Sequence, residues 1–181
     1  MNDDTRAALD LPIDDSYWVQ PGLLLAGEYP GHPRKSIAQA RLGRLLAAGI
    51  RDFLDLTEDW ELNPYTELVA RLASRERTTV EYVRISIPDL CVPTPAIMSS
   101  ILDAIDARMQ AGRPTYLHCW GGVGRTGTVV GCWLVRHGAT GPAALARIDE
   151  WWQAVPKRVR HPRSPETDEQ RRFVLDWREA R

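Results

Sequence analysis

The residues best suited to carry chemistry lie in one segment, which runs from Tyr116 to Gly127 and reads YLHCWGGVGRTG. In this segment a short strand pattern leads through a glycine-rich loop directly into a helical pattern. Glycine allows consecutive amides to point toward one anion, and the helix N-terminus adds partial positive charge. We therefore expect the loop to bind a phosphate group. The residues expected to contact it are Trp120, Gly121, Gly122, Val123, Gly124 and Arg125.

A cysteine and an arginine stand at the two ends of this loop. The amides around Cys119 and the charge of Arg125 should stabilise a thiolate, which is the reactive form of cysteine. Arg125 presents a planar fork that can hold two oxygens of a phosphate during its transfer. The loop lacks the Gly-Lys-Ser/Thr sequence of nucleotide-binding loops. The pattern predicts that Cys119 attacks phosphate monoesters; the alternative is a structural loop with a buried cysteine.

This segment resembles the H-C-x5-R-S/T signature of the protein tyrosine phosphatase superfamily, in the form H-C-x-x-G-x-G-R-T-G. The likeness covers most of the chain from about Tyr17, and the compact length is similar to that of the dual-specificity branch. The resemblance implies that Cys119 is the nucleophile, that Arg125 is a phosphate ligand, that His118 supports the cysteine and that Thr126 places a hydroxyl near the sulfur. For His118, a buried core histidine is the other interpretation.

Displacement of an alkoxide or phenoxide requires an acid that protonates the leaving oxygen. Asp89 is expected to be this acid, because the sequence around it follows a predicted strand and resembles the general-acid loop of the family. Ile87 stands where the larger tyrosine phosphatases carry Trp, so a widely swinging lid is less expected here. Without the cysteine loop, a Pro-Asp pair before a helix would be ordinary turn chemistry.

Gln170 is expected to position the water that hydrolyses a phosphocysteine. The segment ETDEQRRF, residues 166–173, resembles the Q-T-x-x-Q-x-x-F loop of tyrosine phosphatases, with Glu166 in place of the first Gln. Thr167 and Gln170 also have the spacing of a capping box at the start of a helix. Both interpretations remain open.

Strand and helix patterns alternate through the first part of the chain, and helical patterns alone follow Leu117. Asn63 before Pro64, and Thr94 before Pro95, are typical of helix starts. This order predicts an α/β fold with a central mixed, largely parallel sheet flanked by helices. Strands are expected over residues 17–19, 23–26, 53–56, 80–87 and 115–117, and helices over 34–48, 95–111 and 126–137, with others after Asn63 and toward the C-terminus.

The composition predicts a single domain. The 181 residues, 44% of them apolar, can bury a single core, and the net charge of −1 excludes recognition of nucleic acid by bulk charge. We expect a flexible tail over residues 1–16, a phosphatase domain over 17–181, no membrane span, and a monomer in the cytoplasm. Three cysteines do not indicate a disulfide framework.

Several residues outside the loop have open interpretations. Cys91 could form a protective disulfide with Cys119 if the Asp89 loop folds over the site, or it is an ordinary loop cysteine. Cys132 is expected to be a small buried side chain. A basic segment could form a second anion pocket or a solvated loop; its charged residues are Lys157, Arg158, Arg160, His161 and Arg163. The acidic loop with Glu58, Asp59 and Glu61 could border the site, or it is a solvated loop, which is the favoured interpretation.

The sequence as a whole predicts a cysteine-dependent phosphatase of the protein-tyrosine or dual-specificity kind that needs no cofactor and no metal. Its partner would be a phosphorylated protein or a small phosphorylated molecule. The alternatives are a phosphoinositide or inositol phosphate phosphatase, a catalytically silent phosphate-binding module, and a rhodanese-like sulfurtransferase. Trp120 and Val123 bring no lysine into the loop, which weakens the inositide alternative.

Overall fold

The computed structural model describes residues 11–179, which contain a five-stranded sheet with the strand order β1-β2-β5-β3-β4. Strand β1 is antiparallel to β2, and the other neighbouring pairs are parallel. The predicted mixed, largely parallel sheet is confirmed. The strands are β1 (Ser16–Gln20), β2 (Leu24–Gly27), β3 (Asp52–Asp55), β4 (Glu81–Arg84) and β5 (Thr115–His118).

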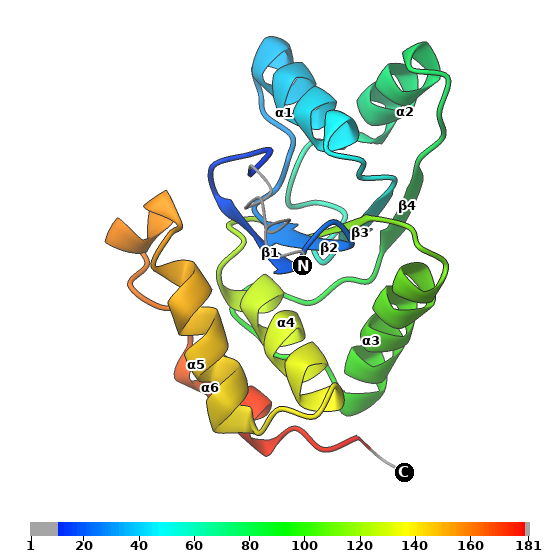
Figure 1. Ribbon diagram of the computed structural model, residues 1–181. Coiled ribbons are helices and arrows are strands. Elements are labelled where there is room, and N and C mark those ends of the chain that lie inside the picture. The colour runs from blue at the N-terminus through cyan, green and yellow to red at the C-terminus, as the bar shows by residue number, and fades with distance from the viewer. Residues whose placement is uncertain (1–10, 180–181) are drawn as a thin grey trace, which may run out of the picture.

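Helices cover both faces of the sheet (Figure 1). Helices α1 (Lys35–Ala47) and α2 (Thr66–Arg75) lie on one face. The other face carries α3 (Pro95–Gln110), α4 (Gly124–Arg136), α5 (Gly141–Trp152) and α6 (Asp168–Asp176), and a short 3₁₀ helix η1 (Pro156–Val159) joins α5 to α6.

The core forms two apolar clusters, one on each side of the sheet. Neighbouring residues of a strand point to opposite faces. In β5, Tyr116 therefore belongs to the cluster beneath α1 and α2, whereas Leu117 belongs to the cluster with α3 to α6. Phe53 and Leu54 of β3 divide in the same way. This packing fixes the register of the central strand that leads into Cys119.

The parallel strands bring several loops to one edge of the sheet, because their carboxyl ends meet there. Strand β5 lies between β2 and β3. The segments that follow β2, β3 and β5 therefore converge, and they carry Glu28, Glu61 and Cys119. The sheet thus brings together residues that are far apart in the sequence.

Some predicted boundaries differ from the structure. The Thr94 cap is confirmed, since its Oγ1 accepts a hydrogen bond of 3.3 Å from the Ile97 amide. The Asn63 cap is wrong: α2 begins at Thr66 with no side-chain cap, and the Asn63 carbonyl accepts a hydrogen bond from the Tyr29 hydroxyl. Strand β4 ends at Arg84 because its partner strand β3 ends at the paired residue Asp55.

The chain is packed before Tyr17. Of the tail expected over residues 1–16, residues 1–10 lie outside the described part of the chain. Ile13 is buried, and its carbonyl accepts a hydrogen bond of 2.6 Å from the Ser16 hydroxyl. Asp15 accepts a hydrogen bond of 3.1 Å from the backbone amide of Lys157. Residues 11–16 therefore belong to the folded domain.

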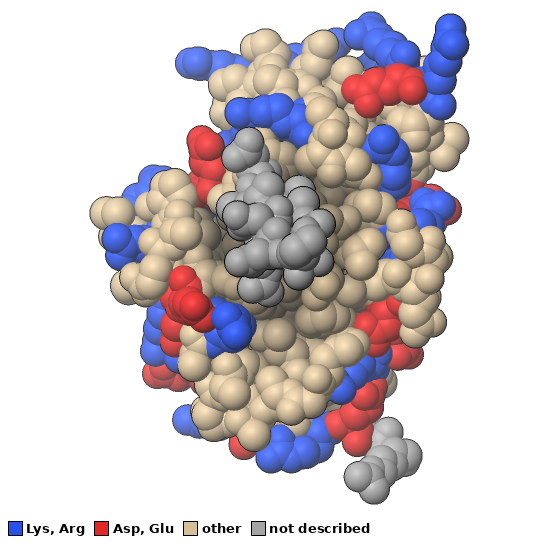
Figure 2. Space-filling model, in the orientation of Figure 1, with Lys and Arg blue, Asp and Glu red and all other residues tan. Residues whose placement is uncertain are grey.

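Charged side chains are not segregated by sign on the face of the molecule that Figure 2 shows. Figure 2 shows acidic and basic side chains interspersed on one face, in keeping with the net charge of −1. Electrostatic recognition must therefore be local. Among residues 11–179, no helix has both the length and the apolar character needed to cross a membrane.

Candidate active site

The loop after β5 carries Cys119 at its start and leads into α4, which begins at Gly124. Cys119 is 2% exposed. Gly122 has a φ of +72°, and a Cβ there would lie 2.5 Å from the carbonyl carbon of Gly27. Only glycine therefore allows the loop to pass this close to β2. Helix α4 begins two residues before the predicted Thr126, so Arg125 lies in its first turn.

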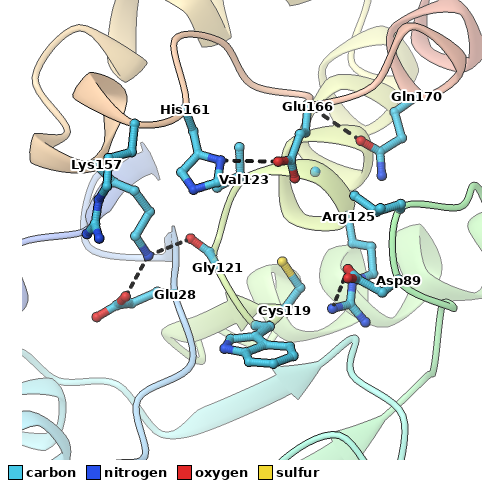
Figure 3. A pocket seen from close by; sticks show the side chains of 14 residues that line it. Glu28, Asp89, Cys119, Gly121, Val123, Arg125, Lys157, His161, Glu166 and Gln170 are labelled. Carbon is cyan, nitrogen blue, oxygen red and sulfur yellow. Dashed lines mark hydrogen bonds and ion pairs between the residues drawn. The ribbon is translucent and has the colours of Figure 1, made fainter.

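A pocket of about 370 Å³ opens above Cys119. Figure 3 shows Asp89 and Arg125 on one side of the sulfur, and Lys157 and His161 on the other. The pocket is therefore wider than the loop alone. Its lining residues are Glu28, Asp89, Leu90, Cys119, Trp120, Gly121, Val123, Gly124, Arg125, Lys157, Arg160, His161, Glu166 and Gln170.

The guanidinium of Arg125 is buried and held from several sides. Its Nη1 and Nη2 donate to the two carboxylate oxygens of Glu61 at 2.6 and 2.9 Å, and Nη1 also donates to the Ile87 carbonyl at 3.0 Å. Asp89 Oδ1 lies 3.0 Å from Nη2 in an ion pair. Burial lowers the pKa of Arg125, but Glu61, Cys119 and Asp89 outweigh it and raise the pKa above its ordinary value.

Glu61 corrects the interpretation of the acidic loop. A solvated loop was favoured over one that borders the site, yet the Glu61 side chain is only 2% exposed. Its Oε1 also accepts a hydrogen bond of 2.8 Å from the Glu58 amide, which folds the loop back on itself. Asp59, by contrast, is 90% exposed and pairs with Arg84. No local pattern in the sequence links Glu61 to Arg125.

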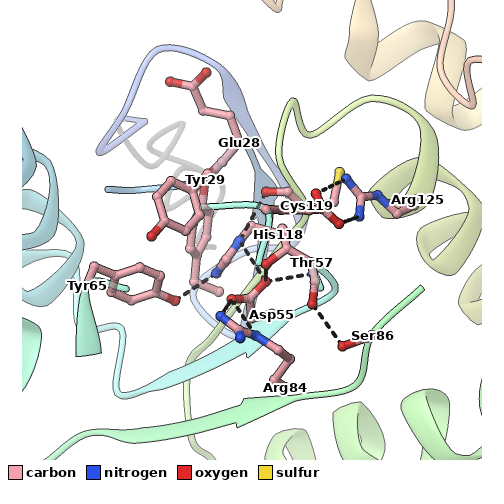
Figure 4. Close-up of polar contacts among 12 residues, drawn as sticks. Glu28, Tyr29, Asp55, Thr57, Tyr65, Arg84, Ser86, His118, Cys119 and Arg125 are labelled. Atoms are coloured by element: carbon pink, nitrogen blue, oxygen red, sulfur yellow. Dashed lines mark hydrogen bonds and ion pairs between the residues drawn. The ribbon is translucent and has the colours of Figure 1, made fainter. Parts of the chain in front are cut away.

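His118 is buried beneath the cysteine, and Figure 4 shows it between Tyr65 and Asp55. Its Nδ1 lies 3.2 Å from the Cys119 carbonyl, and its Nε2 lies 2.7 Å from the Tyr65 hydroxyl. Burial lowers the pKa of His118, which favours the neutral ring. Because a carbonyl can only accept, Nδ1 carries the proton and Nε2 accepts from Tyr65. His118 is thus both a satisfied core histidine and a contact to the Cys119 backbone.

Asp55, which no sequence pattern indicated, lies beside His118 and accepts hydrogen bonds from three neighbouring residues. Its Oδ1 accepts hydrogen bonds from the amide and hydroxyl of Thr57 at 2.8 and 2.7 Å. Its Oδ2 accepts from Tyr82 at 2.6 Å and from Arg84 at 3.1 Å. Burial raises the pKa of Asp55, but His118, Tyr82 and Thr57 together lower it below its ordinary value.

Gln170 lies in the pocket and also caps α6, so both features read from the sequence are present. Its Oε1 accepts hydrogen bonds from the amides of Thr167 and Glu166 at 3.1 and 3.2 Å. Its Nε2 donates to the Cys91 carbonyl at 3.2 Å. A Cβ at position 124 would lie 2.7 Å from Oε1, so a larger residue there would require the Gln170 side chain to shift.

The remaining predicted site residues differ in exposure. Thr126 is buried, and its hydroxyl has no hydrogen-bond partner within the described range 11–179. Trp120 is 54% exposed at the rim, whereas Val123 is buried. Cys132 is buried as expected, and burial raises the pKa of its thiol. Cys91 is exposed and does not line the pocket, so its disulfide with Cys119 stays a prediction.

Several solved structures share this architecture, including those of Tk-PTP and PTPMT1. Tk-PTP in its active form superposes with a TM-score of 0.65 at 27% identity, over 89% of this chain and 93% of that one. PTPMT1 in complex with PI(5)P has a TM-score of 0.60 at 21% identity, over 90% of this chain and 94% of that one. The likeness to PTPMT1 shows the fold alone.

Sequence comparison agrees with the fold. The uncharacterized protein MJECL20 of Methanocaldococcus jannaschii is 33% identical over 97 residues, which are 54% of this chain and 59% of that protein. The match thus spans less than two thirds of that relative's length. A family model described as "Swiss Army Knife protein, DSP-PTPase phosphatase domain" matches residues 14–174. The chain therefore belongs to this family of phosphatase domains.

Proposed function

We propose that this domain hydrolyses phosphate monoesters in two steps, through a phosphocysteine at Cys119. The observation that carries the proposal is the state of Arg125: it lines the pocket with Cys119, and its buried Nε has no hydrogen-bond partner within the described range. Nε and Nη2 form a fork edge that suits two phosphate oxygens. An unpaired buried donor costs free energy, which a bound phosphate would offset.

In the first step the Cys119 thiolate attacks phosphorus while the bond to the leaving oxygen breaks. The loop amides and Arg125 stabilise the charge on the three equatorial oxygens, as phosphoryl transfer requires. Asp89 donates a proton to the leaving oxygen, so that the alcohol or phenol departs neutral. The products of this step are the free alcohol or phenol and an S–P bond at Cys119.

Binding of the substrate would release Asp89 from Arg125, so that it can act as the acid. In the structure its Oδ1 lies 3.0 Å from Nη2 of Arg125. A phosphate on the fork edge competes for the same Nη2, so its arrival displaces the carboxylate from the ion pair. The freed side chain, which is 54% exposed, can then take up a proton and approach the leaving oxygen.

In the second step water attacks phosphorus and the S–P bond breaks, which returns the thiolate and releases inorganic phosphate. Asp89, now ionised, takes the proton from the water. Gln170 lines the pocket and is proposed to position this water. The unpartnered hydroxyl of Thr126 is proposed to stabilise the sulfur as it leaves, and His118 to hold the Cys119 carbonyl through Nδ1.

The proposed substrates are phosphotyrosine and phosphoserine or phosphothreonine in proteins. Phosphoinositides or soluble inositol phosphates are the second candidate class; PTPMT1, which has a similar fold, was solved in complex with PI(5)P. A catalytically silent phosphate-binding module would need no acid. Asp89 beside Arg125 therefore argues for turnover.

The test is turnover of a chromogenic aryl phosphate by the wild type, Cys119→Ser and Cys91→Ser. We expect Cys119→Ser to lose turnover but to keep binding vanadate, because the loop amides survive. Cys91→Ser is the matched control, since Cys91 is exposed and does not line the pocket. Acid quenching of the wild type should trap phosphate on the Cys119 peptide. Full activity of Cys119→Ser, or loss of wild-type activity in a chelator, would contradict the mechanism.

A further inference from the structure

The pocket extends beyond the phosphate loop to the basic segment around η1. Three of its lining residues, Lys157, Arg160 and His161, come from this segment. Figure 3 shows Lys157 and His161 across the Cys119 sulfur from Asp89. The pocket therefore has a basic wall that is separate from the fork of Arg125. The contacts of each basic residue decide which of them can receive a ligand.

Lys157 is already used within the protein. Its Nζ donates to Glu28 Oε2 at 2.6 Å and to the Gly121 carbonyl at 2.9 Å, and its side chain is only 10% exposed. Asp15 Oδ2 also lies 3.8 Å from the Lys157 Nζ. The charge of Lys157 is thus balanced, and its contacts hold the phosphate loop in place.

Two other basic residues do not line the pocket. Arg158 donates to the side-chain oxygen of Gln153 at 3.1 Å. Arg163 donates to Asp168 at 2.7 Å and to the Glu166 carbonyl at 3.1 Å. The original group of basic residues is therefore reduced to Arg160 and His161.

Arg160 differs from the other cations of the pocket. Arg125 pairs with Glu61, and Lys157 pairs with Glu28. The Arg160 side chain has neither an ion pair nor a hydrogen bond with any residue in the range 11–179. His161 lies beside it, with Nδ1 3.1 Å from Glu166 Oε1 and the ring pointing into the pocket. An unpaired guanidinium next to an imidazole suits a doubly charged oxyanion.

From this arrangement we propose, on the basis of the proposed function, that the preferred substrates carry a second phosphate group. Arg160 and His161 bind this second group while Cys119 attacks the first. The second phosphate lies on the side of Cys119 opposite Asp89, so it does not obstruct the acid. The binding is electrostatic at an exposed rim and should weaken with salt, since the Debye length is about 10 Å at 0.1 M.

The test compares phenyl phosphate with the 1,2-, 1,3- and 1,4-phenylene bisphosphates, which have similar leaving groups but carry the second phosphate at different distances. Initial rates of phosphate release give kcat/KM for the wild type, Arg160→Ala and Arg158→Ala. We expect at least one bisphosphate to exceed phenyl phosphate by more than the statistical factor of about two. Arg160→Ala should bring that preference back to the statistical factor, and the loss can reach about 10- to 100-fold, as for removal of a charge-assisted hydrogen bond.

Arg158→Ala is the matched control, because it removes the same charge two residues away from a side chain that does not line the pocket. It should keep the preference and hydrolyse phenyl phosphate like the wild type. An equal loss in the two variants would indicate bulk charge only and overturn the proposal. So would the absence of a preference for any bisphosphate in a wild type that turns over phenyl phosphate.

A separate readout distinguishes this proposal from the mechanism on which it rests. Calorimetric binding of the same four compounds to Cys119→Ser measures the second subsite without turnover. If the wild type shows no turnover, the mechanism fails, but tighter bisphosphate binding that disappears in Cys119→Ser/Arg160→Ala still supports the subsite. Equal affinities for phenyl phosphate and all bisphosphates overturn it.

Discussion

Glu61 holds the guanidinium of Arg125 through two parallel hydrogen bonds of 2.6 and 2.9 Å, and both side chains are almost completely buried. This bidentate pairing occupies the Nη1–Nη2 edge and leaves the Nε–Nη2 edge for a phosphate. In the proposed mechanism the carboxylate sets the orientation of the arginine without contacting the substrate. Glu61 is a positioning residue in this arrangement.

Glu61→Gln tests this role. The variant keeps the shape of the side chain but loses one acceptor and the charge, so Arg125 should tilt away from the phosphate. We expect kcat/KM for an aryl phosphate to fall about 100-fold, the scale of a misplacement near 1 Å. Loss of half of a buried pair should also cost about 3–5 kcal/mol of stability. Steady-state kinetics and urea denaturation measure the two effects.

Asp59→Asn is the control, because Asp59 lies on the same loop but is 90% exposed and pairs with Arg84. It should leave both quantities close to the wild-type values. A positioning role also predicts that Glu61→Gln weakens vanadate binding, which a simple loss of stability would not do below the unfolding transition. Unchanged vanadate affinity in Glu61→Gln would remove the link between Glu61 and the phosphate fork.

Asp89→Asn tests the general acid. The amide cannot donate a proton to the leaving oxygen, so poor leaving groups should suffer most. We expect kcat to fall about 100-fold for an alkyl phosphate and much less for an activated aryl phosphate. A series of substrates with graded leaving-group pKa measures the difference as a slope. Equal slowing across the series would exclude Asp89 from this role.

The part of the candidate site that lies in one continuous segment could be predicted from the sequence of that segment. The loop from Cys119 to Arg125 is contiguous in the sequence. Its glycines and the helix that follows favour a loop whose amides point toward an anion, and the cysteine lies at the start of that loop. Asp89 and Gln170 were expected from family resemblance, and the structure brings both into the pocket. The alternation of strands and helices was similarly sufficient to predict the mixed sheet.

The contacts that sequence patterns did not predict join residues that are distant in the chain. Glu61 contacts Arg125 across a sequence separation of 64 residues, and Asp55 contacts Tyr82 across 27. Neither carboxylate belongs to a periodic pattern, and acidic side chains usually face solvent. The Asn63 prediction failed for a related reason, since the backbone at Asn63 is held by Tyr29 rather than by the next helix.

His118 should make the stability of the domain dependent on pH. Burial lowers its pKa below the ordinary value of 6.5, so the unfolded chain binds a proton that the folded chain excludes. Stability from this group is present above pH 6.5 and is lost as the pH falls below it, by at most about 1.4 kcal/mol per pH unit. Urea denaturation at about pH 7.5 and about pH 5.5 measures the loss.

His118→Gln separates this effect from that of other groups. The variant should show a smaller loss of stability over the same interval. The pKa of Asp55 is also lowered in the folded state, but from 3.8, so its contribution is lost only at more acidic pH. An identical loss in the wild type and in His118→Gln would show that other groups cause the dependence.

Gln170 has two features that a pair of variants can separate. Thr167→Ala and Gln170→Ala each break the capping box of α6, and each should cost about 1 kcal/mol of stability. Only Gln170 lines the pocket, so only Gln170→Ala should slow hydrolysis of the phosphocysteine. Stopped-flow mixing with an aryl phosphate should then show a burst of phenol followed by a slower steady rate.

The burst identifies the affected step because phenol leaves in the first step and phosphate in the second. In Gln170→Ala the burst amplitude should approach one phenol per active site, and acid quenching should trap more phosphate on Cys119 than in Thr167→Ala. A burst of equal size in both variants would assign the effect to the helix cap, which also fixes the Cys91 carbonyl through Gln170 Nε2. The absence of a burst in either variant would leave Gln170 as a capping residue alone and would place the hydrolytic water under the control of other groups in the pocket.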